Sequence, residues 1–279
     1  ESLGGVCLNW GCIPTKALLK SAQVFEYIKN SEDYGITVEN FDKNFDGIIN
    51  RSRKVAQTMS KGVNFLMKKN KIKIFEGFGK LSTDKTINVT DQNGSEIKII
   101  GEKIIIATGA RSKELPSLKK DGKKIIGYRE AMTLEKQPKD IVIVGSGAIG
   151  IEFAYFYNSM GTSVTIVEYL DRIVPVEDSE ISKELEKSLK KKGINILTST
   201  EVEKAEINSS GSVDVTLKNS NGEKSIISTE IVLSAVGIKT NIENIGLEDL
   251  GIKTEKDKIL VDDFYMTNLK DYYAIGDVV

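Results

Sequence analysis

Apolar residues recur at helical spacing in two long segments near the beginning of the sequence. The first starts at about Pro14 and has apolar residues at positions 17, 18, 22, 25 and 28. A proline suits the first turn of a helix, because its missing N–H would have no helical acceptor there. The second runs from about Asp42 to Lys69, with an apolar residue at nearly every third or fourth position. The pattern predicts two long helices that lie side by side, preceded by a loop over 4–14.

The rest of the chain alternates between short strands and further helical segments. Short runs that contain β-branched residues, at 71–75, 86–90, 96–100 and 103–108, predict four strands, with a hairpin tip at 91–94. A strand, helix, strand pattern follows over 141–168. We then predict a charged helix within 173–193, a strand at 194–200, two strands around a turn at 220–223, a buried strand at 231–237 and a last strand at 271–277. This order predicts the α/β class, with mainly parallel sheets and a domain boundary near residue 115.

Composition and charge exclude several classes of function. The 279 residues include 39 Lys plus Arg against 40 Asp plus Glu, two cysteines and no histidine. Without an imidazole there is no Ser-His-Asp triad, Cys-His pair or His-ligated metal, and two thiols do not complete a tetrahedral zinc site. The near-neutral charge offers little attraction for nucleic acid. The longest mostly apolar stretch, 141–157, contains three glycines and is shorter than the roughly 20 residues that span a bilayer. We therefore expect no metal, nucleic-acid or membrane partner.

A glycine-rich motif stands between a predicted strand and the helix that follows it. Gly145 permits a tight turn, Gly147 lets a pyrophosphate approach the backbone, and Gly150 allows the helix and strand to pack closely. Glu168 ends the second strand, 18 residues beyond Gly150. A carboxylate there can accept both ribose hydroxyls of an adenosine and repels a 2′-phosphate. The motif predicts a site for NAD(H) rather than NADP(H).

The two cysteines, Cys7 and Cys12, lie immediately before the first predicted helix. Their spacing is compatible with an incidental pair of buried thiols, with a structural disulfide of a secreted protein, or with a redox-active pair. A thiol at a helix N-terminus has its thiolate stabilised by the helix dipole, which favours reactivity. Glycines before each cysteine also let a flat ligand come close to the backbone. The spacing alone leaves these alternatives open.

The segment GGVCLNWGCIPTKALL at 4–19 resembles the redox-active disulfide segment of the flavin disulfide reductases, the class I pyridine nucleotide-disulfide oxidoreductases. Within that family it is most similar to the branch that oxidises dihydrolipoamide. The resemblance continues through a GFGK turn at 77–80, ATG at 107–109, GIE at 150–152, AVG at 235–237 and YAIGD at 273–277. It therefore covers essentially the whole chain.

The resemblance implies an α/β fold with two Rossmann-like, three-layer domains that bind FAD and NAD(P), the NAD domain being inserted in the FAD domain. It places an FAD-binding domain at 1–114, an NAD-binding domain at 115–240, and a return to the FAD-binding or central domain at 241–279. Because the sequence begins at Glu1 rather than at Met, we expect a central fragment. The N-terminal βαβ unit and the C-terminal dimerisation domain, with its His-Glu pair, would lie outside it.

The resemblance also assigns roles to individual residues. Cys7 would be the interchange thiol and Cys12 the thiolate beside the flavin, with Lys16 and Glu152 forming an ion pair near the flavin. An acid in the apolar segment around Glu152 would be costly to bury without a partner, which supports the pair. The implied FAD contacts are Lys16, Gly79, Thr108, Gly109 and Asp277. The implied NAD contacts are Gly145, Ser146, Gly147, Ala148, Ile149, Gly150, Glu168, Val202, Ala235 and Gly237.

The activity implied by the resemblance is oxidation of dihydrolipoamide through a Cys7–Cys12 disulfide and FAD, with hydride passed to NAD⁺. The intact protein is expected to be a cytoplasmic homodimer acting on lipoyl domains of 2-oxoacid dehydrogenase complexes. The alternatives are another member of the family, of the glutathione or mercuric reductase type, or, for the fragment, a nucleotide-binding module without turnover. One departure from the family pattern is that Ile238 and Lys239 follow AVG, where the family usually has an arginine.

Overall fold

The computed structural model describes residues 2–83 and 85–279, whose contacts group the chain into two compact units. Unit 1 comprises residues 1–61 and 112–237, and unit 2 comprises residues 62–111 and 238–279. These borders lie close to the predicted boundaries at 114/115 and 240/241, but residues 2–61 group with 112–237 rather than with the segment that follows them. The assignment of 1–114, 115–240 and 241–279 to particular cofactors stays a prediction.

Unit 1 is built around a five-stranded sheet with the order β6-β13-β7-β8-β9. Its neighbouring strands all run parallel. The chain passes from β7 through α5 to β8 and then β9 on one side of β7, whereas β13 and β6 lie on the other side. The strands are β6 (Ile125–Ile126), β7 (Asp140–Val144), β8 (Ser163–Val167), β9 (Asn195–Leu197) and β13 (Ile231–Ser234). The direction of winding therefore reverses at β7.

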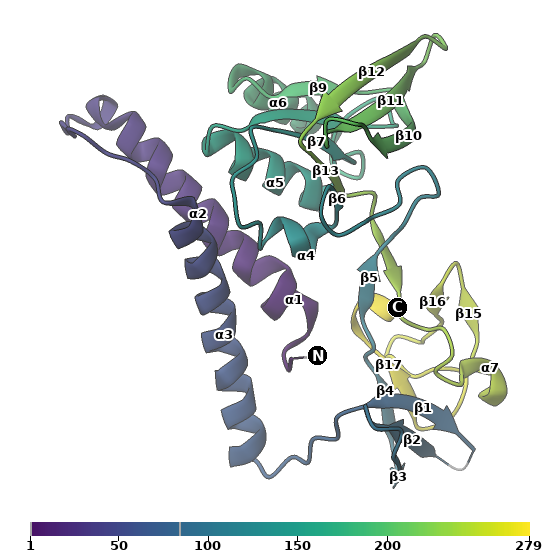
Figure 1. Cartoon of the computed structure of the whole chain (residues 1–279). Coiled ribbons are helices and arrows are strands. Elements are labelled where there is room, and N and C mark those ends of the chain that lie inside the picture. Colours follow the sequence, from purple (N-terminus) through teal and green to yellow (C-terminus); the bar gives the residue numbers. More distant parts are fainter. Residues whose placement is uncertain (1, 84) are drawn as a thin grey trace. The chain divides into compact units, whose positions relative to one another are not determined.

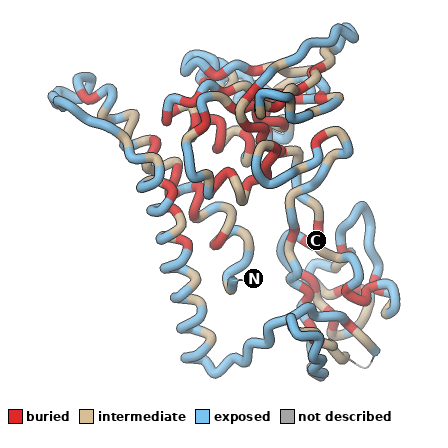
Figure 2. Tube along the Cα trace, in the orientation of Figure 1, coloured by how far each residue is buried: buried red, intermediate tan, exposed pale blue. Residues whose placement is uncertain are grey.

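The two faces of this sheet are buried by different layers. Ile141 and Ile143 of β7 point into a core shared with α2, α4 and α5, whereas Val142 and Val144 point into a core shared with the antiparallel sheet β10-β11-β12. Burial on both faces explains why β7 has an almost continuous apolar sequence. The covering elements are α4 (Tyr128–Ala131), α5 (Ala148–Ser159), α6 (Ser179–Lys191), β10 (Thr200–Ile207), β11 (Val213–Asn219) and β12 (Lys224–Thr229). Figure 2 shows the buried residues of this unit concentrated in these layers.

The N-terminal part of unit 1 is helical. It contains α1 (Gly5–Trp10), α2 (Cys12–Lys29), a short 3₁₀ helix (Ser31–Tyr34) and α3 (Phe45–Lys69), whose residues beyond 61 belong to unit 2. Ser52 of α3 donates a hydrogen bond to the carbonyl of Pro14 at 2.8 Å, and α2 in turn packs on α5. The two predicted helices are confirmed, and Figure 1 shows them side by side. The predicted loop is wrong, because residues 5–10 form α1.

Unit 2 contains a three-stranded antiparallel sheet and a short parallel pair. β1 (Phe78–Ser82), β2 (Thr86–Thr90) and β3 (Glu96–Ile100) form the antiparallel sheet, and β4 (Ile104–Ile106) pairs in parallel with β17 (Tyr272–Ala274). The other elements are β5 (Ala110–Ser112), β14 (Ile238–Thr240), α7 (Leu247–Leu250), β15 (Thr254–Glu255), β16 (Lys258–Ile259) and a 3₁₀ helix (Gly276–Val278). The hairpin tip at 91–94 is confirmed by the hydrogen bond from the Gly94 N–H to the Asp91 carbonyl.

Two further local predictions are wrong, both at the start of unit 2. Residues 71–75 form no strand, although Ile72 and Ile74 alternate with lysines; every residue from 71 to 80 is exposed, so no sheet partner buries the apolar side. Residues 77–80 are not a turn, because β1 begins at Phe78 and pairs residue by residue with β2. Its Leu81 is buried and its N–H donates to the carbonyl of Ile245 at 2.8 Å.

Candidate functional site

The predicted dinucleotide loop lies at one edge of the parallel sheet of unit 1. β7, β8 and β13 run in the same direction, so their carboxyl ends bring together the glycine loop, Glu168 and Ala235. The Ala235 N–H donates to the Val144 carbonyl at 2.8 Å, which places Ala235 directly beside the loop. Val202 is buried in the core on the antiparallel-sheet side, and Gly237 is exposed two residues beyond Ala235. The edge coincides with the reversal of winding at β7, where open α/β sheets bind ligands.

The three glycines of this loop differ in what surrounds them. Gly145 has a φ of +101°, and a Cβ there would lie 2.4 Å from the Ala235 carbonyl oxygen. A Cβ at Gly150 would lie 2.0 Å from the Gly145 carbonyl oxygen, so the first turn of α5 packs against the loop without room for a methyl group. A Cβ at Gly147 would meet nothing within 4 Å. Two of the glycines are therefore required by packing, and Gly147 leaves open space at the N-terminus of α5, where the first N–H groups have no helical acceptor.

Glu168 is buried and already holds the loop. Its Oε2 accepts hydrogen bonds from the N–H of Ser146 at 2.8 Å and from its hydroxyl at 2.6 Å, while Oε1 accepts from the Leu170 N–H at 2.9 Å. The sequence identified Glu168 as a ligand for ribose but did not predict that it ties β8 to the loop. A carboxylate oxygen accepts more than one hydrogen bond, so this structural role is compatible with ligand binding.

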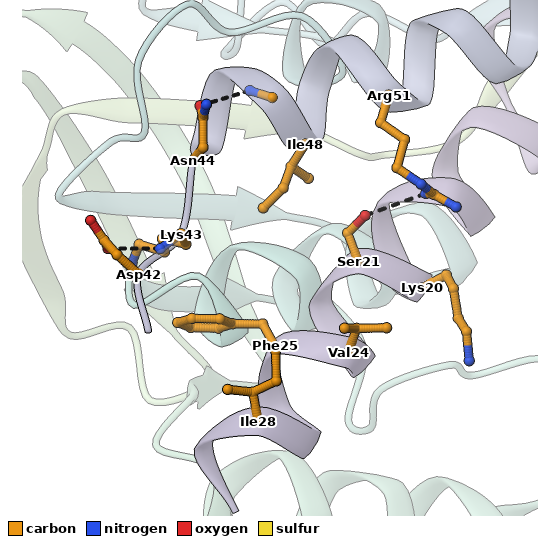
Figure 3. Close-up of a pocket in the computed structure, with 11 residues that line it drawn as sticks. Lys20, Ser21, Val24, Phe25, Ile28, Asp42, Lys43, Asn44, Ile48 and Arg51 are labelled. Carbon is orange, nitrogen blue, oxygen red and sulfur yellow. Dashed lines mark hydrogen bonds between the residues drawn. The ribbon is translucent and has the colours of Figure 1, made fainter. Parts of the chain in front are cut away.

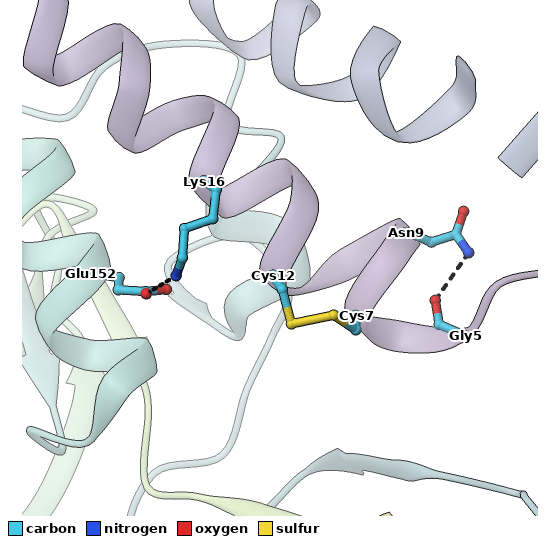
Figure 4. Close-up of a disulfide and its surroundings, with 6 residues drawn as sticks. All are labelled: Gly5, Cys7, Asn9, Cys12, Lys16 and Glu152. Carbon is cyan, nitrogen blue, oxygen red and sulfur yellow. Dashed lines mark hydrogen bonds and ion pairs between the residues drawn. A yellow bond between two sulfur atoms is a disulfide. The ribbon is translucent and has the colours of Figure 1, made fainter. Parts of the chain in front are cut away.

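Cys7 and Cys12 form a disulfide, with their Cα atoms 4.7 Å apart (Figure 4). Cys12 is the first residue of α2, and both cysteines are exposed. The bridge closes across Gly11, where a Cβ would lie 3.1 Å from the Cys7 Cα and from the Val6 carbonyl oxygen. An exposed disulfide at the N-terminus of an 18-residue helix can react with a thiol and has its thiolate product stabilised by the helix dipole. Of the three alternatives that the spacing left open, the structure excludes buried free thiols.

Lys16 and Glu152 form an ion pair between α2 and α5 (Figure 4). Lys16 lies one turn after Cys12 on α2, so both side chains lie on the same face of the helix. The Lys16 side chain is 63% exposed and that of Glu152 28% exposed. Lys16 also lines a pocket of about 310 Å³ with Leu19, Lys20, Gln23 and Tyr155. The disulfide joins Cys7 to Cys12, and the packing of α2 on α5 brings Glu152 to Lys16, one turn after Cys12.

The residues between the two cysteines have partners that the sequence did not reveal. The amide of Asn9 donates to the carbonyls of Leu3 and Gly5, both at 3.0 Å. The guanidinium of Arg53, on α3, lies 4.1 Å from the centre of the Trp10 ring, and that of Arg129, on α4, lies 5.5 Å from it. Trp10 is the only tryptophan in the sequence and stands inside the CxxxxC segment, which is the one signal that could have drawn attention to it.

In unit 2, two of the predicted FAD-contact segments meet at the end of the parallel pair. β4 ends two residues before Thr108, and β17 ends three residues before Asp277, so parallel pairing brings Thr108, Gly109 and Asp277 to the same edge. Asp277 and Thr108 are exposed there. Gly79 lies instead in β1 of the antiparallel sheet. The structure therefore groups three of the four unit 2 candidates.

The turn at Thr108 and Gly109 is held by residues beyond β14. The Thr108 hydroxyl donates to the Asn241 carbonyl at 2.6 Å, and the Asn241 N–H donates to the Gly109 carbonyl at 2.8 Å. Arg111 pairs with Glu243 at 2.8 Å, and Lys239 pairs with the same carboxylate at 2.8 Å. The hydrogen bond from Arg111, with that from Lys239, holds the pKa of Glu243 well below its usual range. Lys239, which departs from the family pattern, is thus engaged with Glu243.

A further pocket in unit 1 contains none of the predicted site residues (Figure 3). It has a volume of about 440 Å³ and lies between α2 and the start of α3. Its walls combine apolar and cationic side chains, among them Val24, Phe25, Ile48, Lys43 and Arg51. Arg51 donates to the Ala17 carbonyl at 2.8 Å and Lys43 to the Met160 carbonyl, so both cations are hydrogen-bonded to the protein. Within residues 2–83 and 85–279 no group of three or more acidic or cysteine side chains is arranged to hold a metal ion, and no helix is long and apolar enough to cross a bilayer.

The family model described as pyridine nucleotide-disulphide oxidoreductase matches residues 1–279. The chain belongs to the pyridine nucleotide-disulphide oxidoreductase family. This confirms the resemblance found in the sequence.

Several curated relatives in this family are dihydrolipoyl dehydrogenases. The chain is 44% identical over 293 residues to the protein from Rhizobium etli, covering 100% of the chain and 61% of that relative. It is 43% identical over 276 residues to the protein from Zymomonas mobilis, covering 99% and 59%, and 41% identical over 288 residues to the protein from Bacillus subtilis, covering 100% and 60%. The chain thus spans about 60% of the length of these relatives.

A solved structure supports the fold. The crystal structure of LpdA from Mycobacterium tuberculosis matches with a TM-score of 0.90 at 24% sequence identity, covering 100% of this chain and 60% of that one. The predicted α/β class is therefore confirmed.

Proposed function

We propose that the protein containing this chain is a dihydrolipoyl dehydrogenase, which oxidises dihydrolipoamide and passes hydride to NAD⁺. The observation that carries the proposal is the exposed Cys7–Cys12 disulfide at the start of α2, in the same unit as a complete dinucleotide loop. Relatives at 41–44% identity bear this name, which supports the substrate assignment.

The loop residues fit NAD. The open space at Gly147 would let a pyrophosphate approach the first N–H groups of α5, which supply hydrogen bonds and the positive end of the helix dipole. Glu168 would accept the ribose hydroxyls of the adenosine, and its fixed negative charge disfavours a 2′-phosphate. The segment 112–237 would be the NAD domain, inserted in the FAD domain. Ser146, Ala148 and Ile149 would line the pyrophosphate, and Val202, Ala235 and Gly237 the rest of the nucleotide.

Each unit, taken by itself, carries residues that would serve as FAD contacts. In unit 2, Thr108, Gly109 and Asp277 offer hydroxyl, backbone and carboxylate groups at the open end of the parallel pair, and Gly79 would contact the adenosine part. In unit 1, Lys16 would donate to the flavin from the face of α2 that carries Cys12, with Glu152 fixing the ammonium. When bound, FAD would supply the two-electron transfer between a dithiol and the nicotinamide.

The chain's own step is thiol–disulfide exchange. A thiolate of dihydrolipoamide would attack the sulfur of Cys7, breaking the Cys7–Cys12 bond and releasing Cys12 as a thiolate. The second substrate thiol would then displace Cys7, so that lipoamide leaves as a cyclic disulfide and both cysteines are reduced. Two electrons thus enter the Cys7–Cys12 pair and leave it as the disulfide re-forms, with NAD⁺ as the final acceptor. The α2 dipole would stabilise the Cys12 thiolate, and Lys16, one turn further along α2, would add a positive charge on the same face of the helix.

The partners follow from the substrate. We propose that the intact protein is a homodimer in the cytoplasm, acting on lipoyl groups carried by 2-oxoacid dehydrogenase complexes. The region beyond the chain's share of its relatives would supply the acid–base histidine that these 279 residues lack.

The test uses the protein expressed from its natural reading frame and follows NADH formation from dihydrolipoamide. We expect Cys7→Ser and Cys12→Ser each to abolish turnover, while both variants keep the NADH affinity of the wild type because the loop at 145–150 is untouched. The proposal is overturned if either variant turns over at the wild-type rate. It is equally overturned if the wild type reduces glutathione disulfide with NADPH and does not accept dihydrolipoamide.

A further inference from the structure

Trp10 occupies an unusual position in the redox segment. It is the last residue of α1 and is separated from Cys12 only by Gly11. Its indole ring is contacted by two cations from different helices: the Arg53 guanidinium, 4.1 Å from the ring centre, and the Arg129 guanidinium, 5.5 Å from it. Trp10 packs against the main core of unit 1 and is half-buried. α3 and α4 thus both hold the short helix that carries Cys7.

Arg53 is committed to this contact. Its Nη1 atom is buried and has no hydrogen-bond partner among the described residues, and burial lowers the pKa of its guanidinium. A guanidinium partly withdrawn from water interacts more strongly with an aromatic face, since solvent screens the attraction less. An arginine so placed, with one nitrogen unsatisfied, is explained by its packing on Trp10 better than by any ion pair.

The contact bears directly on the two sulfurs. Cys7 lies one turn before Trp10 on α1, and Cys12 begins α2 just after it. The Asn9 amide, next to Trp10 in α1, donates to the carbonyl of Leu3 and to that of Gly5 at the start of the helix. Figure 4 shows the bond to Gly5. Once the disulfide is reduced, the two sulfurs are linked only through the backbone between Cys7 and Cys12. The probability that they meet again then depends on how firmly α1 is held against α2, which is an effective concentration.

We propose that Trp10, clamped by Arg53 and Arg129, is a positioning residue that keeps the Cys7 and Cys12 thiols in bonding register and thereby sets their thiol–disulfide equilibrium. The inference rests on the proposed redox role of the pair. Reduction by dithiothreitol has a simple balance: the reagent's two thiols lose two electrons and two protons and close to a cyclic disulfide, while the Cys7–Cys12 bond breaks and both sulfurs become thiols. Loosening the clamp lowers the effective concentration of the thiols and shifts this balance toward the reduced pair.

The test measures the fraction of reduced pair in buffers of oxidised and reduced dithiothreitol, by alkylation and mass spectrometry, and needs no bound flavin and no turnover. In the full-length protein we expect Arg53→Gln and Trp10→Leu each to shift the equilibrium about tenfold toward the dithiol, which corresponds to about 30 mV. Arg53→Lys keeps a cation over the ring, so its thiol–disulfide equilibrium should stay close to that of the wild type. Arg51→Gln is the matched control, because Arg51 lies on the same helix but bonds to α2 at Ala17 rather than to Trp10.

The outcomes separate the clamp from the function on which it rests. The clamp is refuted if the thiol–disulfide equilibrium constants of Arg53→Gln and Trp10→Leu stay within twofold of the wild-type value. It is also refuted if Arg51→Gln changes this constant as much as they do. If the wild-type pair resists dithiothreitol in the folded protein, the proposed redox function fails first. Should Trp10→Leu not fold, as judged by NADH binding, Arg53→Gln with its Arg53→Lys partner decides the matter.

Discussion

Two glycines of the dinucleotide loop provide a matched pair of substitutions with opposite expected effects. A Cβ at Gly150 would lie 2.0 Å from the Gly145 carbonyl oxygen, whereas a Cβ at Gly147 would have nothing within 4 Å. Gly147 also has a φ of −68°, which an alanine adopts without strain. We therefore expect Gly150→Ala to damage the fold and Gly147→Ala to damage only ligand binding.

The loss of stability expected for Gly150→Ala follows from this contact between the added Cβ and the Gly145 carbonyl oxygen. To reach ordinary van der Waals distance, the start of α5 and the turn at Gly145 must separate by more than an ångström, and both atoms in conflict belong to the backbone or are fixed to it. The cost should fall at the upper end of the range for overpacking, about 3 kcal/mol. For a unit of this size that is a fall in melting temperature of roughly 6–12 °C.

For Gly147→Ala, the free energy of unfolding should stay within about 0.5 kcal/mol of the wild type. The added methyl would occupy the space through which a pyrophosphate reaches the helix N-terminus, so we expect NADH affinity to fall at least about tenfold, or 1.4 kcal/mol. Thermal unfolding and NADH fluorescence titration measure the two effects. The reasoning is refuted if Gly150→Ala has the melting temperature of the wild type, or if Gly147→Ala binds NADH as tightly as the wild type.

Three more substitutions test other parts of the structure. Glu168→Ala should lower the affinity for NADH about tenfold and the affinity for NADPH by less. Equal losses of affinity in titrations with both nucleotides would contradict the role of the carboxylate. Because Arg111 and Lys239 lower the pKa of Glu243, the ion pairs stabilise the fold above the unfolded value of 4.5 and lose this effect as the pH falls through the folded value. The difference in urea midpoint between wild type and Glu243→Gln should therefore shrink from about pH 6 to about pH 3, and a constant difference would contradict a contribution from these ion pairs. Tyr157→Phe should lower the free energy of unfolding in urea by about 1–2 kcal/mol, because the buried phenol donates to a backbone carbonyl of α4 at 2.6 Å. Burial also raises the pKa of this phenol, so it stays a hydrogen-bond donor. An unchanged free energy of unfolding would show that the carbonyl finds another donor.

Much of unit 1 could be predicted because its signals are local. The strand, helix, strand pattern of β7, α5 and β8 was confirmed, and so were α2 and α3. Each is long or buried enough that the periodicity of its own residues decides its structure. The same holds for Gly145 and Gly150, since the tight turn and the close helix–strand contact at these two places in the pattern leave no room for a side chain.

The failures occurred where distant residues decide the structure. Residues 5–10 form a helix in contact with Arg53 and Arg129, which lie 43 and 119 positions beyond Trp10 and leave no local pattern. Residues 71–75 have the alternation of a strand, but a strand requires a partner and this segment has none that buries its isoleucines. Glu168 as a tie for the loop and Asn241 as a support for Thr108 also depend on contacts between residues far apart in the sequence. The Cys7–Cys12 disulfide, which the family resemblance implied, is present in the structure.

The strand order of unit 1 also determines when the nucleotide loop is completed during synthesis. β8 follows β7 closely in the sequence, but the strand on the other side of β7, β13, comes much later: Ile231 of β13 pairs with Ile141 of β7, 90 positions earlier. At ordinary elongation rates the ribosome needs roughly 5–20 s to make that length of chain. Throughout this interval β7 exposes an unpaired apolar edge and Gly145 lacks the carbonyl of Ala235 that packs on it. The nucleotide loop is therefore completed only after residue 235 has been synthesised.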